Sequence, residues 1–235
     1  MRLLALDTAT AQATCAVCDA DRVLAEKARE VTTHSELLLA LIDETLRAAG
    51  VSLPDLDAVV CGQGPGSFTG LRIGMATAKG LCFALEVPLL APSSLEGLAR
   101  AVNRVGPATV VACLDARRQE IFAAAWRFDE DGASTRLLAP MAGGPAAVAE
   151  AVLALDTPTP PILAGTGATL YRDQLTALLG DAAALPTDAP QTPDAAVLAD
   201  LAADLLAAGD TANLSATEPE YLRPSDAELN RNRPP

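Results

Sequence analysis

Aromatic residues are scarce in this chain of 235 residues, at 3%, and histidine occurs only once, as His34. A zinc site with two histidine ligands on one helix needs two imidazoles. No such metal site can form within one copy of the chain, so we predict no metal ligands and exclude a zinc peptidase of that kind. We expect His34 to be a surface or helix-capping residue.

Basic residues are also few, because 17 Lys and Arg stand against 30 Asp and Glu, for a net charge of −13. An acidic surface repels polyphosphates, and nucleic-acid binding depends on Lys and Arg that release counterions. We therefore expect any involvement with RNA to be indirect. The N-terminus lacks the apolar stretch of a signal peptide, and no apolar run approaches the roughly 20 residues of a membrane span. We expect a cytoplasmic protein without membrane contact.

The five cysteines lie mostly in apolar runs, which predicts reduced core residues and not a disulfide framework; they are Cys15, Cys18, Cys61, Cys82 and Cys113. Cys15 and Cys18 form a C-x-x-C within a predicted strand. Residues three apart on a strand point to opposite faces, so this pair cannot chelate one metal.

Hydrophobic patterning predicts that the first half of the chain begins with three antiparallel strands and continues with alternating helices and strands. The expected strands cover residues 2–7, 12–18, 22–30, 57–62 and 87–91. Helices are expected from a Thr33 cap to residue 49, from the Gly-Pro loop at 62–66 to residue 85, and after a cap at Ser93. This order predicts a mixed sheet with helices on its faces.

Gly106-Pro107 marks the expected boundary between two units, residues 1–105 and a smaller 106–224. The second unit is expected to contain a strand at 109–115, a hairpin of 120–128 and 134–139, and a strand at 162–164. Its helices are expected at 146–155, from the turn at 165–167 to residue 179, and at 194–208. The polar tail, 225–235, is expected to be disordered.

The most informative stretch is the loop between a strand and a helix at residues 61–74, C-G-Q-G-P-G-S-F-T-G-L-R-I-G. Its glycine spacing is not that of a dinucleotide-binding loop, and no Gly-Lys-Ser/Thr completes a P-loop. Motif statistics alone favour a sharp start of a helix without a ligand over an anion site. Ser67 and Thr69 are better explained as capping hydroxyls than as nucleophiles.

The string G-P-G-S-F-T-G-L-R-I-G nevertheless resembles the signature of the TsaB family, the tRNA threonylcarbamoyladenosine biosynthesis proteins. This loop string is highly specific. Other segments that resemble the family are less specific alone, but they occur in the same order along the chain as in the family. They are L-A-L-D-T-A-T at 4–10, H-S-E-L-L at 34–38, L-D-A-R at 114–117 with Glu120, and E-P-E-Y-L-R at 218–223.

The resemblance implies an α/β fold on the actin-like ATPase (ASKHA, RNase H-like) scaffold, with two lobes of mixed sheets flanked by helices and a reduced second lobe. It also implies an accessory subunit without catalytic residues, in the complex that transfers threonylcarbamoyl to N6 of adenosine in the anticodon loop of tRNA. The implied partners are a TsaD-type catalytic subunit, which carries the metal and the transferase chemistry, and a TsaE-type ATPase. The alternatives are a small actin-like ATPase or kinase acting alone and, against the histidine count, a peptidase.

Several residues could face an anion or a nucleotide if the chain kept the ATPase use of this scaffold. Asp7 and Asp115 end strands, where paired carboxylates could position Mg-bound water; the simpler explanation is that both terminate strands and cap turns. The full set of candidates is Asp7, Thr8, Gly64, Gly66, Ser67, Thr69, Asp115, Gly165 and Gly167. We expect no cofactor to be required by this chain, and ATP with Mg²⁺ only at the level of the complex.

Two helices are candidates for a partner interface. The first has more apolar positions than one buried stripe needs, at Leu37, Leu38, Leu39, Leu41 and Ile42. The second places Gly70, Gly74 and Ala78 on one face, where glycine costs roughly 1 kcal/mol against alanine. Close approach of a partner is one reason for these glycines, and close approach to the chain's own sheet is the other. The same surface could form a homodimer when the chain is alone.

Overall fold

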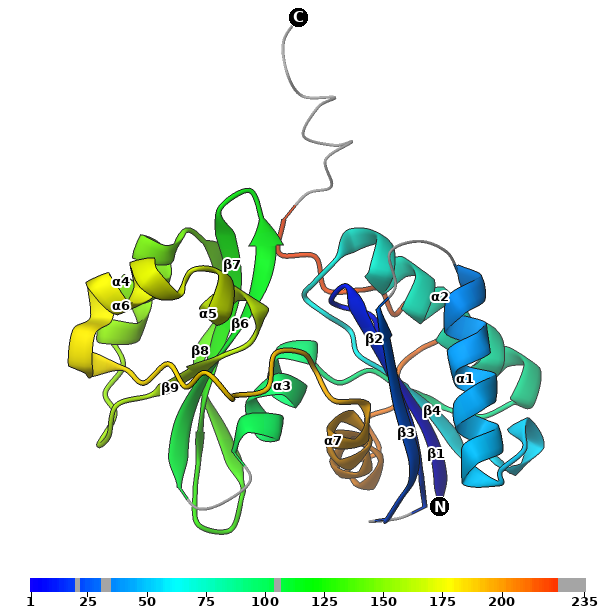
Figure 1. Cartoon of the computed structure of the whole chain (residues 1–235). Coiled ribbons are helices and arrows are strands. Elements are labelled where there is room, and N and C mark those ends of the chain that lie inside the picture. The colour runs from blue at the N-terminus through cyan, green and yellow to red at the C-terminus, as the bar shows by residue number, and fades with distance from the viewer. Residues whose placement is uncertain (20–21, 31–34, 104–106, 224–235) are drawn as a thin grey trace, which may run out of the picture.

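The computed structural model describes residues 1–19, 22–30, 35–103 and 107–223, and it forms two lobes, each with one sheet (Figure 1). The first sheet has the order β3-β2-β1-β4-β5. Its strands β1, β2 and β3 are antiparallel neighbours, whereas β4 and β5 run parallel to β1, so the predicted mixed sheet is confirmed. The strands are β1 (Arg2–Asp7), β2 (Gln12–Asp19), β3 (Arg22–Glu30), β4 (Ala58–Cys61) and β5 (Leu89–Leu90).

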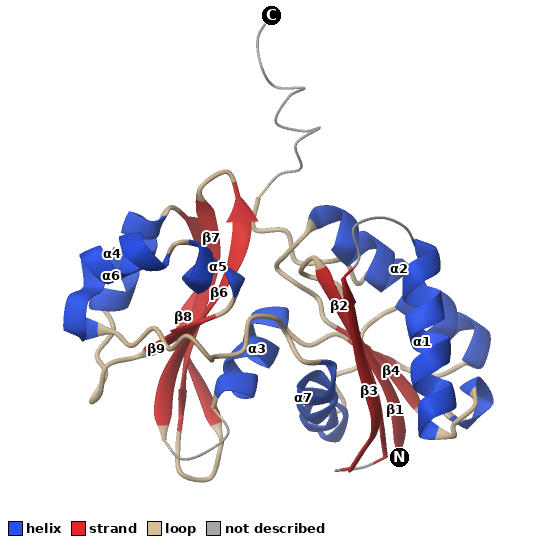
Figure 2. Ribbon diagram, viewed as in Figure 1, coloured by secondary structure: helices blue, strands red, loops and turns tan. Residues whose placement is uncertain are grey.

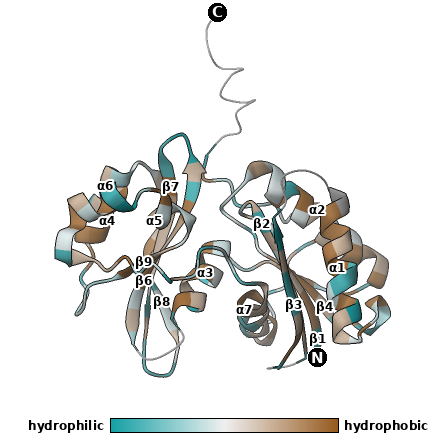
Figure 3. Cartoon of the chain, viewed as in Figure 1, coloured by the Kyte–Doolittle hydropathy of each residue, from teal (hydrophilic) through white to brown (hydrophobic). Residues whose placement is uncertain are grey.

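Both faces of the first sheet are covered, because its central strands carry apolar side chains on both sides. Helices α1 (Ser35–Ala49) and α2 (Phe68–Leu85) cover one face, where Leu4 and Val17 are buried. Helix α7 (Ala195–Ala207) covers the other face, where Leu3 is buried (Figure 2). Both hydrophobic and hydrophilic residues occur along α1 and α2, as the brown and teal stretches of Figure 3 show. A short 3-10 helix, Leu53–Asp55, precedes β4.

The second sheet has the order β8-β7-β6-β9, with β9 parallel to β6 and the other pairs antiparallel. Three helices cover one face and α3 covers the other, so this sheet is also buried on both sides. The strands are β6 (Ala108–Arg117), β7 (Glu120–Phe128), β8 (Ser134–Gly143) and β9 (Ile162–Ala164). The helices are α3 (Ser94–Val102), α4 (Pro145–Leu153), α5 (Thr166–Leu170) and α6 (Arg172–Leu179), followed by a 3-10 turn at Gly180–Ala182.

The lobes meet through α3 and α7, which lie between the two sheets (Figure 1). Gly97 allows this contact, because a Cβ built there would lie 2.6 Å from Leu198 Cδ2. Arg100 on α3 also pairs with Asp204 on α7 at 3.3 Å. The division into units 1–105 and 106–224 stays a prediction, and α7, which belongs to the second of these ranges, packs on the first sheet.

The differences from the predicted elements are local. The expected helix up to residue 179 is interrupted at Tyr171 and forms α5 and α6, and the hairpin arm β8 extends to Gly143 instead of 139. All five cysteines are buried and free, with Cys15 and Cys18 on opposite faces of the first sheet, as predicted. The predicted Thr33 cap, His34 and the 225–235 tail lie outside the described residues. Within the described ranges, no helix is long and apolar enough to cross a membrane.

Candidate functional site

The Asp7 carboxylate at the end of β1 is buried and hydrogen-bonded within the chain. Its Oδ1 accepts the Ala9 N–H at 2.8 Å and its Oδ2 accepts the Ser94 hydroxyl at 2.6 Å. Gly62 covers it so closely that a Cβ there would lie 1.9 Å from Oδ2. Burial raises the pKa of Asp7 from 3.8 to about 6, against the opposite effect of the bonds from Ser94 and Ala9. Asp7, which is 1% exposed, is therefore enclosed and bound within the chain, which favours the simpler explanation that it ends a strand and caps a turn.

The predicted glycines of the loop also serve contacts within the chain. A Cβ at Gly66 would lie 2.3 Å from the Ala9 carbonyl oxygen, and one at Gly64 would lie 2.8 Å from Leu71 Cδ1. Gly64 also has φ = +106°, a conformation that favours glycine. Gly64 is thus explained by packing, while Gly66 packs on Ala9 and also borders the cleft between the lobes.

The glycine face of α2 packs against the residues that follow β1. A Cβ at Gly70 would lie 2.2 Å from the Thr8 carbonyl oxygen, and one at Gly74 would lie 2.2 Å from Thr8 Oγ1. Thr8 is buried and donates its hydroxyl to the Gly70 carbonyl at 2.8 Å. Ala78 is fully buried in the core of the first lobe. The buried Gly74, Ala78 and Thr8 are therefore explained by packing within the chain, while Gly70 is half-buried and the interface assignment of this face stays a prediction.

A cavity of about 470 Å³ separates the lobes on one side of the α3–α7 contact. Four of the predicted residues line it, namely Gly66, Ser67, Thr69 and Asp115. Ser67 is the N-cap of α2, as predicted, because its Oγ accepts the Gly70 N–H at 3.3 Å. The remaining lining comes from residues 9–11, Phe68, 116–118, Phe122, Thr166 and 220–223.

Gly165 and Gly167 lie behind this cavity, where they let α5 pack on β6. A Cβ at Gly165 would lie 2.3 Å from the Cys113 carbonyl oxygen, and one at Gly167 would lie 3.0 Å from the Leu114 carbonyl. Both are buried, and neither lines the cavity. The structure thus corrects their assignment as residues that face a nucleotide.

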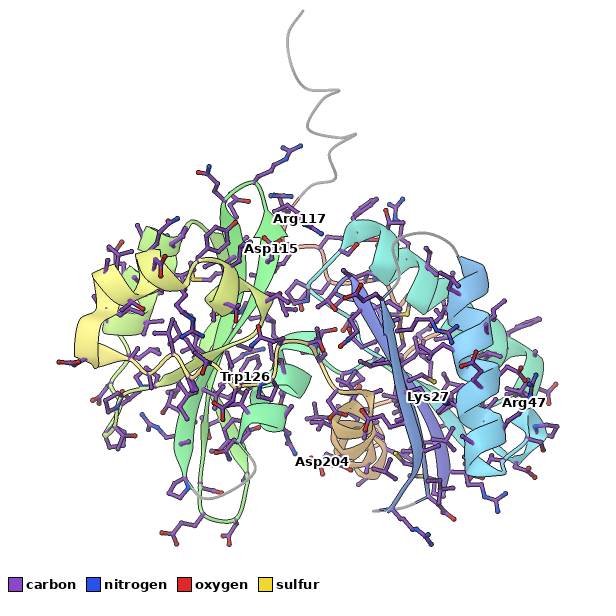
Figure 4. The ribbon with its side chains drawn as sticks, viewed as in Figure 1. Lys27, Arg47, Asp115, Arg117, Trp126 and Asp204 are labelled. Carbon is purple, nitrogen blue, oxygen red and sulfur yellow. The ribbon has the colours of Figure 1, made fainter. Side chains whose placement is uncertain are left out.

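Asp115 organises the turn between β6 and β7 at the edge of the cavity (Figure 4). Its Oδ1 accepts the Arg117 N–H at 2.9 Å, and its Oδ2 lies 3.5 Å from Arg117 Nη1. The three residues Arg117, Arg118 and Gln119 have φ values of 62°, 52° and 63°. Such left-handed conformations cost about 1 kcal/mol or more per residue. No glycine or asparagine in the sequence marks this turn, so sequence reasoning missed it.

Asp7 and Asp115 do not form a paired carboxylate site, because Asp7 is enclosed below the loop while Asp115 borders the cavity. Within the described ranges, no group of three or more His, Cys, Asp or Glu side chains is arranged to hold a metal ion. Ser94, the partner of Asp7, was expected only as part of a helix cap, since the sequence shows nothing of a contact across 87 residues.

A second candidate surface is formed by the outer sides of α1 and α2. Of the predicted residues, Leu38, Leu41 and Ile42 are buried in the core and are not available as an outer surface, whereas Leu37 is half-buried and keeps part of its surface exposed. Leu39 is 52% exposed. On α2, Phe83 is 82% exposed, and a Cβ at Gly80 would meet nothing within 4 Å. We call Leu39, Ala76, Gly80 and Phe83, all exposed, the outer face of α1 and α2.

Comparison with known proteins places this geometry in a family. The family model described as "TsaD: tRNA N6-adenosine threonylcarbamoyltransferase" matches residues 25–230. The chain is 38% identical over 133 residues to the tRNA threonylcarbamoyladenosine biosynthesis protein TsaB of Escherichia coli, a match that covers 56% of this chain and 58% of that relative. It thus spans little more than half of that relative's length.

Two further proteins match over nearly the full chain. TsaB of Bacillus subtilis is 28% identical over 97% of this chain and 96% of its own length. The structure of YeaZ from Pseudomonas aeruginosa superposes with a TM-score of 0.80 at 33% identity, covering 94% of this chain and 99% of that one. The predicted actin-like, two-lobed α/β fold is confirmed. The chain belongs to the TsaB family, within the wider group that the tRNA N6-adenosine threonylcarbamoyltransferase model describes.

Proposed function

We propose that the chain takes part in the synthesis of threonylcarbamoyladenosine in tRNA, as an accessory subunit that binds and activates a TsaD-type catalytic subunit. The catalytic subunit would transfer the threonylcarbamoyl group to N6 of adenosine in the anticodon loop. Membership in the TsaB family supports the pathway, since relatives in Escherichia coli and Bacillus subtilis are named for this biosynthesis.

The observation that carries the accessory role is the enclosed Asp7. The strand-end carboxylate that could position a phosphate or Mg-bound water is buried beneath Gly62 and bound to Ser94. The sequence also contains a single histidine, so it cannot supply the two imidazoles of a His-pair metal site. These residues support a chain that contributes no catalytic group and requires no cofactor of its own. ATP and Mg²⁺ would act at the level of the complex.

The outer face of α1 and α2 is our proposed docking surface for the catalytic subunit. An exposed Phe83 and an exposed Leu39 are large apolar side chains that a partner could bury. Among the described residues, nothing lies within 4 Å of a Cβ built at Gly80, yet glycine weakens a helix. Close approach of a second backbone would explain it. We propose that the same face forms a homodimer when the chain is alone.

The roles that we propose for a TsaE-type ATPase and for tRNA rest on the family of the chain and on its net charge. A TsaE-type ATPase would join the complex through another surface or through the catalytic subunit. The net charge of −13 disfavours direct binding to a polyphosphate, so tRNA would be held mainly by the catalytic subunit.

The proposal is tested by mixing the chain with the TsaD-type protein of the same organism and measuring complex formation by light scattering after gel filtration. We expect Phe83→Arg to abolish the complex and the modification of tRNA that depends on it. Leu170→Arg is the matched control, because Leu170 is 60% exposed on the second lobe and should tolerate the charge. Gly74→Arg is unsuitable as a probe, since its side chain would collide with Thr8.

Retention of a fully active complex by Phe83→Arg would contradict the docking surface. Modification of tRNA by the purified chain alone would contradict the accessory role. If the isolated chain hydrolysed ATP, and Asp115→Ala abolished the hydrolysis, the alternative of an actin-like ATPase or kinase acting alone would replace our proposal.

A further inference from the structure

The segment at residues 218–223 follows α7 and crosses from one lobe to the other. It is first held by the loop after β4, because the Glu220 N–H donates to the Gln63 carbonyl at 2.8 Å. The Gln63 side chain donates back to the Glu218 carbonyl at 2.9 Å. Two hydrogen bonds to one residue fix the path of the segment along the first lobe.

Tyr221 then packs on the first turn of α2. Its ring centroid lies 4.9 Å from that of Phe68, and its hydroxyl accepts the Arg72 Nε–H at 3.1 Å. The Arg72 guanidinium lies 3.9 Å from the Phe68 centroid, within the range of a cation–π contact. Phe68 and Arg72 belong to the loop string that identifies the family, and this contact gives them a physical role.

The other end of the segment is bound to the second lobe. Leu222 packs against a core cluster that contains Phe122 of the second lobe and also Ala9 and Leu71 of the first. Arg223 Nη1 donates to Glu120 Oε2 at 2.6 Å, and these side chains are 23% and 36% exposed. A short hydrogen bond between two charged groups is among the stronger polar contacts in a protein, and partial burial reduces its screening by solvent.

Residues 220–223 also line the cavity between the lobes, together with Ser67 and the turn at 116–118. The segment therefore crosses the mouth of the cleft, whereas the α3–α7 contact lies at its base (Figures 1 and 4). Two lobes joined only at the base of a cleft could rotate about that contact. Residues 191–193 also bridge the lobes, because the Thr166 N–H donates to the Gln191 carbonyl at 3.0 Å and the Thr14 hydroxyl donates to the Pro193 carbonyl at 3.1 Å. A further connection across the mouth adds to the resistance against such a rotation.

We propose that residues 218–223 are an interlobe latch that fixes the angle between the two lobes and the first turn of α2. The latch couples the loop at 63–72 in the first lobe to the β6–β7 turn in the second, through Gln63 and Tyr221 on one side and Arg223 on the other. This role is independent of which partner the chain binds.

Hydrogen–deuterium exchange of the full chain tests the latch. Arg223→Gln and Glu120→Gln each break the same ion pair, and we expect each to increase exchange at residues 63–72, in the other lobe, by roughly tenfold. The double variant should show the increase of either single variant, because both remove one interaction. Arg47→Gln is the control, since its pair with Asp43 lies within α1, and it should leave residues 63–72 unchanged.

Tyr221→Ser breaks the latch from the opposite side and should increase exchange at residues 116–122. The proposal is overturned if each variant loosens only residues 218–223 and leaves the opposite lobe unchanged. It is also overturned if the effects of Arg223→Gln and Glu120→Gln multiply in the double variant.

Discussion

Asp7 is a carboxylate at a strand end that the fold encloses and binds within the chain. An ionised carboxylate loses its hydration on burial, and two hydrogen bonds recover only part of that loss. The pKa of Asp7 is accordingly raised to about 6. The same contacts join β1 to α3, so the residue that would face a ligand in an open site here connects two elements of the core.

The raised pKa of Asp7 predicts that stability decreases as pH rises from about 4 to about 6. Below 3.8 the carboxyl is protonated in both the folded and unfolded states, and above about 6 it is ionised in both. Between these values the folded state binds more protons, so raising the pH favours unfolding. The effect is at most about 3 kcal/mol, at about 1.4 kcal/mol for each pKa unit.

Denaturant unfolding of the wild type and of Asp7→Asn across this pH range measures the effect. The amide does not titrate, and it can still accept the Ala9 N–H and contact Ser94. We expect the difference in unfolding free energy between the two proteins to shift in favour of Asp7→Asn as pH rises. A difference that stays constant from pH 4 to pH 6 would contradict the assignment, because the other carboxylates are common to both proteins.

At the scale of elements, helix α2 has glycines on two faces, one packed against the chain and the other exposed. Gly74 faces Thr8 without room for a methyl group, whereas Gly80 faces open space. Gly74→Ala should therefore destabilise the isolated chain by about 1–3 kcal/mol through overpacking. Gly80→Ala, in the same helix, should stabilise it by about 1 kcal/mol, because alanine is the better helix former.

Thermal and denaturant unfolding distinguish these two substitutions under identical conditions when both are made in the Phe83→Arg variant, which we expect to be a monomer. Equal changes for Gly74→Ala and Gly80→Ala would show that helix propensity alone decides both. Gly80→Ala should also weaken binding to the catalytic subunit if a second backbone approaches there, and the stability measurement separates that loss from unfolding.

The sequence predicted local features of these elements well. An apolar run identified β1, alternating polar and apolar residues identified β2, and a turn before residue 22 identified β3. The Ser67 hydroxyl identified the start of α2. It could not decide which face of α2 is buried, because Gly70, Gly74 and Ala78 have the same helical spacing whether they contact a sheet or a partner. Phe83 was missed because a single apolar residue near a helix end carries no pattern.

The candidate site was harder to predict, because its contacts join residues that are distant in sequence. Asp7 meets Ser94 across 87 residues, and Arg72 meets Tyr221 across 149. The position of Asp7 at a strand end was predicted correctly. The exposure of its carboxylate could not be predicted, because it depends on Gly62, which covers the carboxylate only in the folded chain. Periodicity describes one element at a time, so it cannot place such contacts.

At the scale of the whole molecule, the surfaces by which the two lobes contact each other differ from the surface that we propose for partner binding. Helix α3 and the apolar face of α7 pack between the sheets, and the segment at 218–223 lines the cavity between the lobes. Helices α1 and α2 lie on the far side of the first sheet from α7 (Figures 1 and 2). A partner bound there would leave the cleft and the second lobe accessible.

One docking face that serves two partners predicts competition between them. The isolated chain should be a homodimer whose fraction rises with concentration, and Phe83→Arg should make it a monomer while Leu170→Arg remains a dimer. Adding the TsaD-type subunit should replace the homodimer by a complex with one copy of each chain, because two copies cannot occupy the same Phe83 surface. Analytical ultracentrifugation at several mixing ratios measures these masses. A stable complex that retains the intact homodimer would instead require that the catalytic subunit binds elsewhere, and Phe83 would then belong to the homodimer alone.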